Sequence, residues 1–245
     1  MKKVRKNIEP AGLTSFHNEA THDRSFEAFS SHRQGDAKRE LREQLAGDQA
    51  GLCAYCEIAF VPLDSAPVIE HFHPRSVSTC GSVRREWDID WDNLLGVCSG
   101  GGGKNDARCD RLKGGHHLCG VIHNPLVLSI GPWYSVDLQT GLVEPGPDCP
   151  PHERDRVRVT VNQLGLNGEL SDARRALIDD LLDDLDRRTT ELARRNHPEP
   201  EKQARRDVAR LEFADSTRWP QFFTTIRSTL RQEAEERLHS LSFSG

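Results

Sequence analysis

The sequence predicts an α+β protein in which a small metal-built module lies between an N-terminal helical arm and a C-terminal helical region. Six of the seven cysteines lie between residues 52 and 120, where short strand-like runs are separated by turn residues. The segments on either side carry apolar residues at helical spacing. A chain of 245 residues can bury a hydrophobic core without help from disulfides.

We expect four segments along the chain: a helical arm over 1–51, the metal-built module over 52–120, a loop and hairpin connector over 121–165, and a helical region over 166–245. In the arm, Asp36 is placed to cap a helix whose Leu41 and Leu45 share one face and which ends at Gly51. The favoured interpretation is that this arm packs onto the module.

The connector and the last third have their own patterns. Residues 133–136 and 142–143 predict a hairpin. Residues 156–161 alternate and predict a strand, with irregular structure before the next helix as the alternative. Three apolar stripes then predict helices: Leu177, Ile178, Leu181, Leu182 and Leu185 after a cap at Ser171; Ala204, Val208 and Leu211; and Phe222, Ile226, Leu230, Ala234 and Leu238. Neighbouring arginine and aspartate pairs in the first helix favour a solvated face over a nucleic-acid groove.

Charge and targeting signals limit the function classes. The chain has 33 basic and 38 acidic residues and a net charge of −5. This balance argues against coating nucleic acid by bulk charge, but not against a local basic groove. No apolar run approaches the ~20 residues of a membrane span, and the start lacks an apolar signal core. We therefore expect a cytoplasmic protein without a membrane partner, in which cysteines serve metal binding or reactivity before disulfides.

The pair Cys53 and Cys56 forms a C-x-x-C knuckle that can supply half of a tetrahedral zinc site. Cys98 after an apolar run and Cys109 at a helix start are the candidates for the other half. Cys119, His116 and His117 are further candidate ligands for this zinc site. A thioredoxin-type redox dithiol is the alternative, but the βαβ pattern that it requires is missing. Cys80 and Cys149 lack partners at ligand spacing and are expected to be ordinary residues.

A catalytic pattern follows the knuckle. An apolar strand delivers Glu70 and His71, which point to opposite faces unless the strand bends. A neutral histidine can take a proton from water near pH 7, and a carboxylate suits a hard ion such as Mg²⁺. The amide of Asn93 can fix the orientation of a histidine, and Asp110 offers a second oxygen ligand at a helix start. Each residue alone also fits a purely structural role.

Taken in order, these motifs resemble a known family. The order runs Cys53-Ala54-Tyr55-Cys56, Glu70-His71-Phe72-His73-Pro74, Asn93-Leu94-Leu95, Cys98 and Cys109-Asp110-Arg111-Leu112-Lys113. It is similar to the zinc-knuckle branch of the HNH endonucleases. The resemblance implies a ββα-metal module with His71 as general base and Asn93 orienting it. It also implies that Glu70 and Asp110 hold a catalytic Mg²⁺ or Mn²⁺, while the four cysteines bind a separate structural Zn²⁺.

Two features depart from the family pattern. A glycine-rich insertion stretches the second C-x-x-C, and Asp110 replaces the usual helix histidine or asparagine. The second departure leaves His116 or His117 open as the true ligand. Flanking runs also resemble one subgroup, the HNH subunits of Septu-type and retron-linked anti-phage systems, which act beside an ATPase partner. These runs include Leu52-Cys53-Ala54-Tyr55-Cys56-Glu57, Asn124-Pro125-Leu126 and Leu164-Gly165-Leu166-Asn167.

The expected function is metal-dependent hydrolysis of phosphodiester bonds, with DNA favoured over RNA as substrate. Residues expected to grip the phosphate backbone are Arg75, Lys104, Arg108, Arg111 and Lys113. Because acids interleave with these cations, the chain would rely on a partner such as the ATPase subunit for delivery. The alternatives are a nuclease for structured RNA such as tRNA, and a non-catalytic zinc module that serves as a docking platform.

Overall fold

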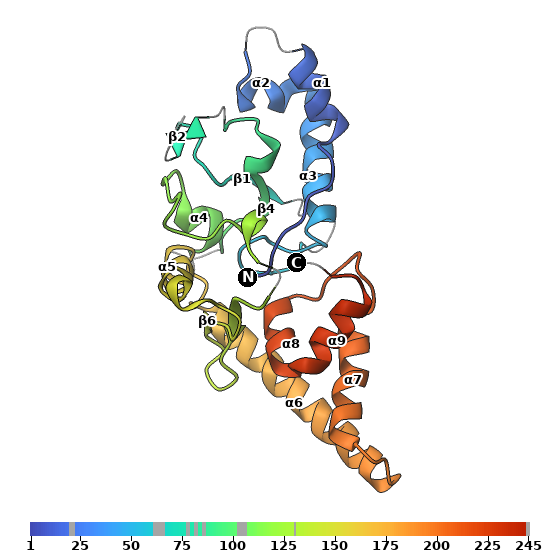
Figure 1. The fold of residues 1–245 in the computed structure, drawn as a ribbon. Helices are drawn as coiled ribbons and strands as arrows, with labels where there is room; N and C mark the ends of the chain where they lie inside the picture. Colours follow the sequence, from blue (N-terminus) through green and yellow to red (C-terminus); the bar gives the residue numbers. More distant parts are fainter. Residues whose placement is uncertain are drawn as a thin grey trace.

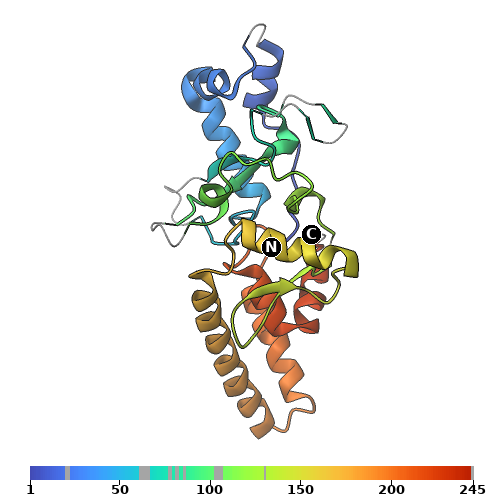
Figure 2. The same ribbon diagram turned by 90° about the vertical axis from the view of Figure 1, so that its left-hand side faces the viewer.

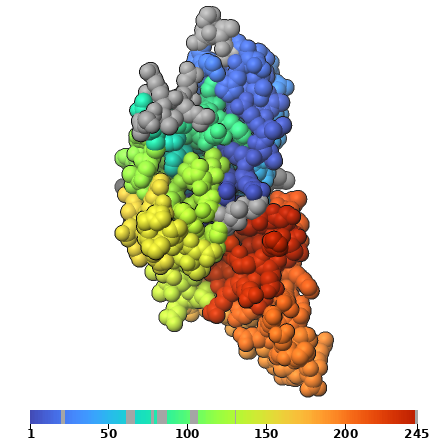
Figure 3. Space-filling view, viewed as in Figure 1, coloured from blue at the N-terminus to red at the C-terminus, as the bar shows by residue number. Residues whose placement is uncertain are grey.

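The computed structural model describes residues 1–19, 23–60, 67–76, 79–80, 83–84, 87–101, 107–129 and 131–243. The molecule is elongated, with the N-terminal helices at one end and long C-terminal helices extending from the other (Figure 1). The view turned by 90° keeps this order, and the space-filling view shows the C-terminal helices as a projecting tip (Figures 2 and 3). The predicted mixture of helix and sheet is confirmed.

The described residues of the N-terminal arm form three α-helices: α1 (Ala11–Glu19), α2 (Phe26–Ser31) and α3 (Asp36–Asp48). Leu41 and Leu45 are buried on one face of α3, in a cluster that includes Trp91 of the module. The arm therefore packs onto the module. Asp36 is not the cap that was expected. Gly35 precedes the helix with a φ of +89°, and Asp36 lies in the first turn, where a carboxylate is favoured by the helix dipole.

The central module is built on an antiparallel pair of strands, β1 (Val68–His71) and β4 (Leu94–Val97). All four residues of β4 are buried. Its Gly96 is clamped by the side chain of Gln49, whose amide donates to the Gly96 carbonyl and accepts from the Gly96 N–H, both at 2.7 Å. A Cβ at position 96 would lie 3.1 Å from the Pro67 Cβ and 3.2 Å from this amide, so these neighbours would have to shift slightly. The clamp fixes β4 against the end of α3.

Two smaller elements complete the module. The short helix α4 (Cys109–Lys113) follows β4 in the chain, and β2 (Thr79–Cys80) pairs with β3 (Val83–Arg84). The prediction that a helix starts at Cys109 is confirmed. The backbone N–H of Cys109 donates to the Leu164 carbonyl at 3.0 Å. This bond joins the helix start to the connector.

In the connector, the predicted hairpin is confirmed as β5 (Tyr134–Val136) and β6 (Val143–Pro145). The strand predicted over residues 156–161 is wrong, because this segment lies in helix α5 (Arg154–Gln163). Val157, Thr160 and Val161 are buried in the spacing of one helix face. In a run this short, alternating apolar residues also lie four positions apart, as Val157 and Val161 do, and therefore share one face of a helix.

The C-terminal region contains four helices: α6 (Leu170–Arg194), α7 (Pro200–Glu212), α8 (Phe223–Leu230) and α9 (Gln232–Ser240). The single helix predicted from the third stripe is wrong, because the chain breaks at Arg231, which has a φ of +56°. Leu211 of the second stripe is exposed. Exposed Arg175 and Asp179 pair one turn apart at 3.1 Å, which fits the predicted solvated face of α6.

One buried carboxylate joins the module to these helices. Glu57 directly follows Cys56 and accepts hydrogen bonds from the Thr224 backbone N–H at 2.7 Å and from its hydroxyl at 2.6 Å. Burial raises the pKa of Glu57, but the N-terminal ammonium and Thr224 outweigh it, so the net direction is downward. The Glu57 carbonyl also accepts from the Phe222 N–H.

None of the helices in the described ranges is long and apolar enough to cross a bilayer.

Candidate active site and metal centres

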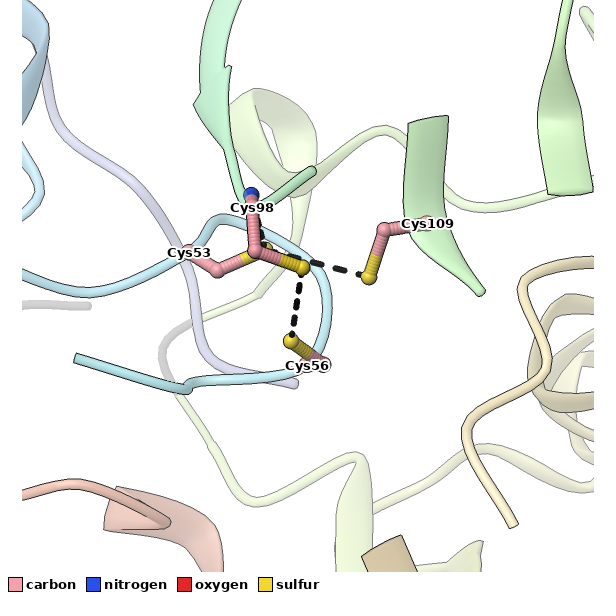
Figure 4. A group of neighbouring side chains, drawn as sticks. All are labelled: Cys53, Cys56, Cys98 and Cys109. Atoms are coloured by element: carbon pink, nitrogen blue, oxygen red, sulfur yellow. Dashed lines mark hydrogen bonds between the residues drawn. The ribbon is translucent and has the colours of Figure 1, made fainter. Parts of the chain in front are cut away.

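The four predicted cysteine ligands converge. The sulfurs of Cys53 and Cys109 lie 3.8 Å apart, and those of Cys56 and Cys98 lie 3.6 Å apart. Figure 4 shows the four side chains pointing toward a common centre from the knuckle, the end of β4 and the start of α4. All four sulfurs lie within 4.8 Å of one another. Segments distant in the sequence therefore meet in one sulfur cluster.

This cluster fits a tetrahedral metal. A Zn–S bond of ~2.3 Å implies sulfur separations of about 3.8 Å along the edges of a tetrahedron. The Cys98 N–H also donates to the Cys53 sulfur at 3.3 Å, a contact that stabilises a thiolate. Contacts from Cys109 and the other sulfurs lower the pKa of Cys98, while burial raises the pKa of Cys109. The cluster could hold a metal such as zinc, whose charge would favour four thiolates. A redox dithiol would need only Cys53 and Cys56, so their contacts with the distant Cys109 and Cys98 favour a metal site over the redox alternative.

His71 ends β1 and lines a cavity of about 610 Å³. Its Nε2 lies 2.8 Å from the Asp88 carbonyl, which can only accept, so Nε2 carries the proton. The Phe26 ring packs edge-on against the imidazole, with the two ring centroids 4.8 Å apart. Burial lowers the pKa of His71 below its ordinary value of 6.5, and the ring is therefore neutral near pH 7, with Nδ1 able to accept a proton.

Glu70 is buried beside His71. Its Oε1 lies 2.6 Å from the ammonium of Lys113 and 3.4 Å from the Tyr55 hydroxyl, which donates to it. Burial raises the pKa of Glu70 to about 7, and Lys113 opposes that rise. Contact with the Asp110 carboxyl adds to it. Glu70 and Asp110 thus meet at the wall of the same cavity, and two adjoining carboxylates are a donor set suited to a divalent cation.

Asn93 acts on a neighbour of His71 and not on His71 itself. Its Oδ1 accepts from the His73 N–H at 2.7 Å, and its Nδ2 donates to the carbonyls of His73 and Trp87 at 2.9 and 2.7 Å. The Asn93 side chain is fully buried. It holds the backbone that leaves β1 against the segment that carries Asp88. Its effect on His71 therefore passes through the backbone.

The residues predicted to contact phosphate differ in their exposure and in their partners. Arg75 lines the cavity and pairs with Glu27 and Asp88. Arg111 is exposed and donates to the Gly101 carbonyl, and Arg108 is half-buried at the start of α4. Lys104 lies outside the described residues. Lys113 does not fit the prediction, because burial and its bond to Glu70 turn its ammonium away from solvent.

The prediction that Cys80 is an ordinary residue is wrong. Cys80 forms a disulfide with Cys119, with a Cα–Cα distance of 6.3 Å. The expectation that cysteines here serve metals before disulfides therefore fails for this pair. Spacing could not find it, because 39 residues separate the partners. Cys149 is a free, buried cysteine, in line with its prediction.

His116 and His117 do not line the cavity that contains Glu70 and His71. The ring centroid of His117 is 6.2 Å from that of His73, and His117 lies beside the disulfide. His116 is exposed after the end of α4. Among the described residues, Asp110 is therefore the better partner for Glu70.

Sequence reasoning missed three residues around the cavity. Phe26 and Glu27 come from the N-terminal arm, and Asp88 accepts from the Phe26 N–H at 2.8 Å. Because 62 residues separate Phe26 from Asp88, no local pattern carries this signal.

A comparison with known proteins finds one relevant similarity. A curated protein of Escherichia coli, named as a candidate HNH endonuclease of retron Ec83, is 34% identical to the chain over 107 residues. The matched stretch covers 43% of this chain and 40% of the relative, so the chain spans about two fifths of that relative's length. No family model matches the chain. The match supports the HNH resemblance for part of the chain.

Proposed function

We propose that the protein is a metal-dependent HNH endonuclease that hydrolyses phosphodiester bonds, with DNA as the favoured substrate. The observation that carries this proposal is the cavity in which Glu70, His71 and Asp110 meet. A four-cysteine cluster lies next to it at the start of the same helix as Asp110. The partial similarity to a protein named as an HNH endonuclease supports the same reaction class.

In this proposal His71 is the general base. The Asp88 carbonyl fixes the imidazole with Nε2 protonated, which leaves Nδ1 to take the proton from an attacking water. The Phe26 ring limits rotation of the imidazole. The base is thus oriented before substrate arrives, and a neutral imidazole is ready at physiological pH.

Glu70 and Asp110 would hold the catalytic ion, Mg²⁺ or Mn²⁺. When bound, such an ion supplies positive charge to the phosphate under attack and to the leaving oxygen. The contact with Lys113 at 2.6 Å favours the ionised form of Glu70 and opposes the burial that raises its pKa to about 7. The four cysteines would hold a structural Zn²⁺ that fixes the start of α4 and hence Asp110.

Substrate binding by the chain alone would be modest. Arg75 lines the cavity but is already paired with carboxylates, and Arg111 is exposed on α4 without lining the cavity. With a net charge of −5, we propose that a partner delivers the substrate. The relative's name links it to a retron, and this link supports a role in a defence complex. An ATPase is the proposed partner, because the subgroup that the flanking motifs resemble acts beside one.

The test is a nicking assay on supercoiled plasmid with Mg²⁺ or Mn²⁺, with chelation and metal add-back, and a parallel assay on structured RNA. We expect His71→Ala to lower the nicking rate at least ~100-fold while zinc content stays unchanged. His152→Ala, the same change at an exposed histidine outside the cavity, should cleave as the wild type does. Unchanged cleavage by His71→Ala would overturn the assignment. Cleavage of RNA alone would move the substrate to structured RNA.

A further inference from the structure

A second group of metal-ligating side chains lies outside the active-site cavity. The ligand atoms of His73, Cys80, His117 and Cys119 all lie within 4.8 Å of one another. They come from the loop after β1, from β2 and from the loop after α4. In this structure the two sulfurs are joined as a disulfide, and both imidazoles lie next to them.

We propose that, once the Cys80–Cys119 disulfide is reduced, these four side chains bind a second Zn²⁺. Two thiolates and two imidazoles are one of the donor sets that structural zinc sites use. Bonds of ~2.3 Å to sulfur and ~2.0 Å to nitrogen imply ligand separations of roughly 3.3–3.8 Å, so small side-chain rotations suffice. A structural zinc bound by two thiolates needs two further ligands, and the two imidazoles can supply them.

The two imidazoles differ in exposure and in the contacts that hold them. His73 stacks on the Trp87 ring with centroids 4.0 Å apart, and Asn93 holds its backbone on both sides. His117 is exposed and follows α4 by a short loop. One imidazole is thus fixed within the module, while the other can move to complete the coordination sphere.

The disulfide and the zinc site exclude each other. Two equivalents of a small thiol, or one dithiol, reduce the S–S bond to two thiols and are themselves oxidised to a disulfide. Zinc then displaces one proton from each thiol and binds each imidazole through an unprotonated nitrogen, with no change in its own oxidation state. A reducing environment therefore favours zinc, and oxidation favours the disulfide without it.

Zinc at this position would brace the proposed active site. His73 lies two residues after His71, and His117 follows Lys113 and the end of α4. The ion would tie together the two elements that carry His71 and Asp110. This bracing role rests on the proposed function, whereas zinc binding itself does not.

The test counts zinc in the full chain, prepared anaerobically with a phosphine reductant and freed of excess metal. We expect two zinc ions per chain by mass spectrometry, and one in the double variant Cys80→Ser/Cys119→Ser. Cys149→Ser, a matched change at a free buried cysteine, should retain two. In Co²⁺-loaded protein, the wild-type spectrum minus that of the double variant should show a tetrahedral site with two thiolates.

Equal zinc content in the reduced wild type and the double variant would overturn the proposal. If the double variant fails to fold by circular dichroism, His117→Asn replaces it, since this side chain is exposed. We expect His117→Asn to lose one zinc to a competing chelator at least ~10-fold faster than the wild type does, and equal rates would contradict the site. Absent cleavage with two bound zinc ions would count against the nuclease proposal alone.

Discussion

The ammonium of Lys113 lies 2.6 Å from Oε1 of Glu70, and both side chains are almost completely buried. The same ammonium donates to the His71 carbonyl at 2.9 Å. Lys113 therefore connects the Glu70 carboxylate, the backbone of His71 and helix α4, which carries Asp110. Removing it should therefore cost more than an ordinary surface ion pair would.

We expect Lys113→Met to lower the free energy of unfolding by about 3–5 kcal/mol, because it leaves a buried carboxylate without its counter-charge. The double variant Glu70→Gln/Lys113→Met should recover at least half of that loss, since no unpaired charge remains. Urea unfolding of the wild type, the two single variants and the double variant measures the coupling. Strictly additive effects would show that the pair does not interact energetically.

Cys109→Ser should remove one zinc ion per chain and lower the free energy of unfolding by more than about 3 kcal/mol, because structural zinc contributes on the order of 10 kcal/mol in small metal-built domains. Cys149→Ser provides the control, since Cys149 is equally buried but lies outside both clusters. Zinc analysis and thermal unfolding measure the two effects. A Cys109→Ser protein with wild-type zinc content would contradict the four-cysteine site.

Asn93→Asp should be almost as damaging as Asn93→Ala. The aspartate keeps the oxygen that accepts from the His73 N–H but cannot donate to the carbonyls of His73 and Trp87. Each buried group left without a partner costs about 1–3 kcal/mol, so we expect a total loss near 3 kcal/mol in either variant. Denaturant unfolding checks this, and full stability in Asn93→Asp would show that the donor bonds contribute little.

His123 should make the protein less stable as the pH falls below about 6.5. Its Nδ1 accepts from the Tyr134 hydroxyl at 2.6 Å, and its Nε2–H donates to Glu153 at 3.0 Å, an arrangement that needs the neutral ring. Burial lowers the pKa of His123 below its ordinary value of 6.5, and Glu153 only partly opposes this. The unfolded chain therefore binds more protons between the folded pKa and 6.5, and stability declines through that window.

Unfolding free energies measured from about pH 7.5 down to about pH 5 test this expectation. The decline should be smaller in His123→Gln than in the wild type, and His239→Gln at an exposed position of α9 should follow the wild type. An identical decline in all three proteins would assign the pH dependence to other groups.

Local chemistry made part of this site predictable. The C-x-x-C knuckle, the strand before Cys98 and the helix start at Cys109 are each encoded within a few residues, so the sulfur cluster could be foreseen. The same holds for Glu70 and His71 at the end of an apolar strand. These features need only short-range pattern and the coordination preferences of zinc.

Other features depend on contacts that no local pattern contains. The cover that Phe26 places over His71 and the pairing of Cys80 with Cys119 both join distant segments. Arg231 interrupts a four-residue apolar repeat that continues on both sides, so the repeat alone predicts one helix. Residues 156–161 fit both a strand and a helix until their packing partners are known.

Glu57 has a consequence for how the molecule can be divided. It follows a cysteine of the sulfur cluster directly, and both of its carboxylate oxygens are used by Thr224 at the start of α8. Cutting away the last helices would remove both Thr224 donors from this carboxylate, which is next to Cys56 in the chain, and leave it paired with the N-terminal ammonium. We therefore expect the cysteine-rich centre and the C-terminal helices to melt together as one cooperative unit, so that the centre would not fold as an isolated fragment.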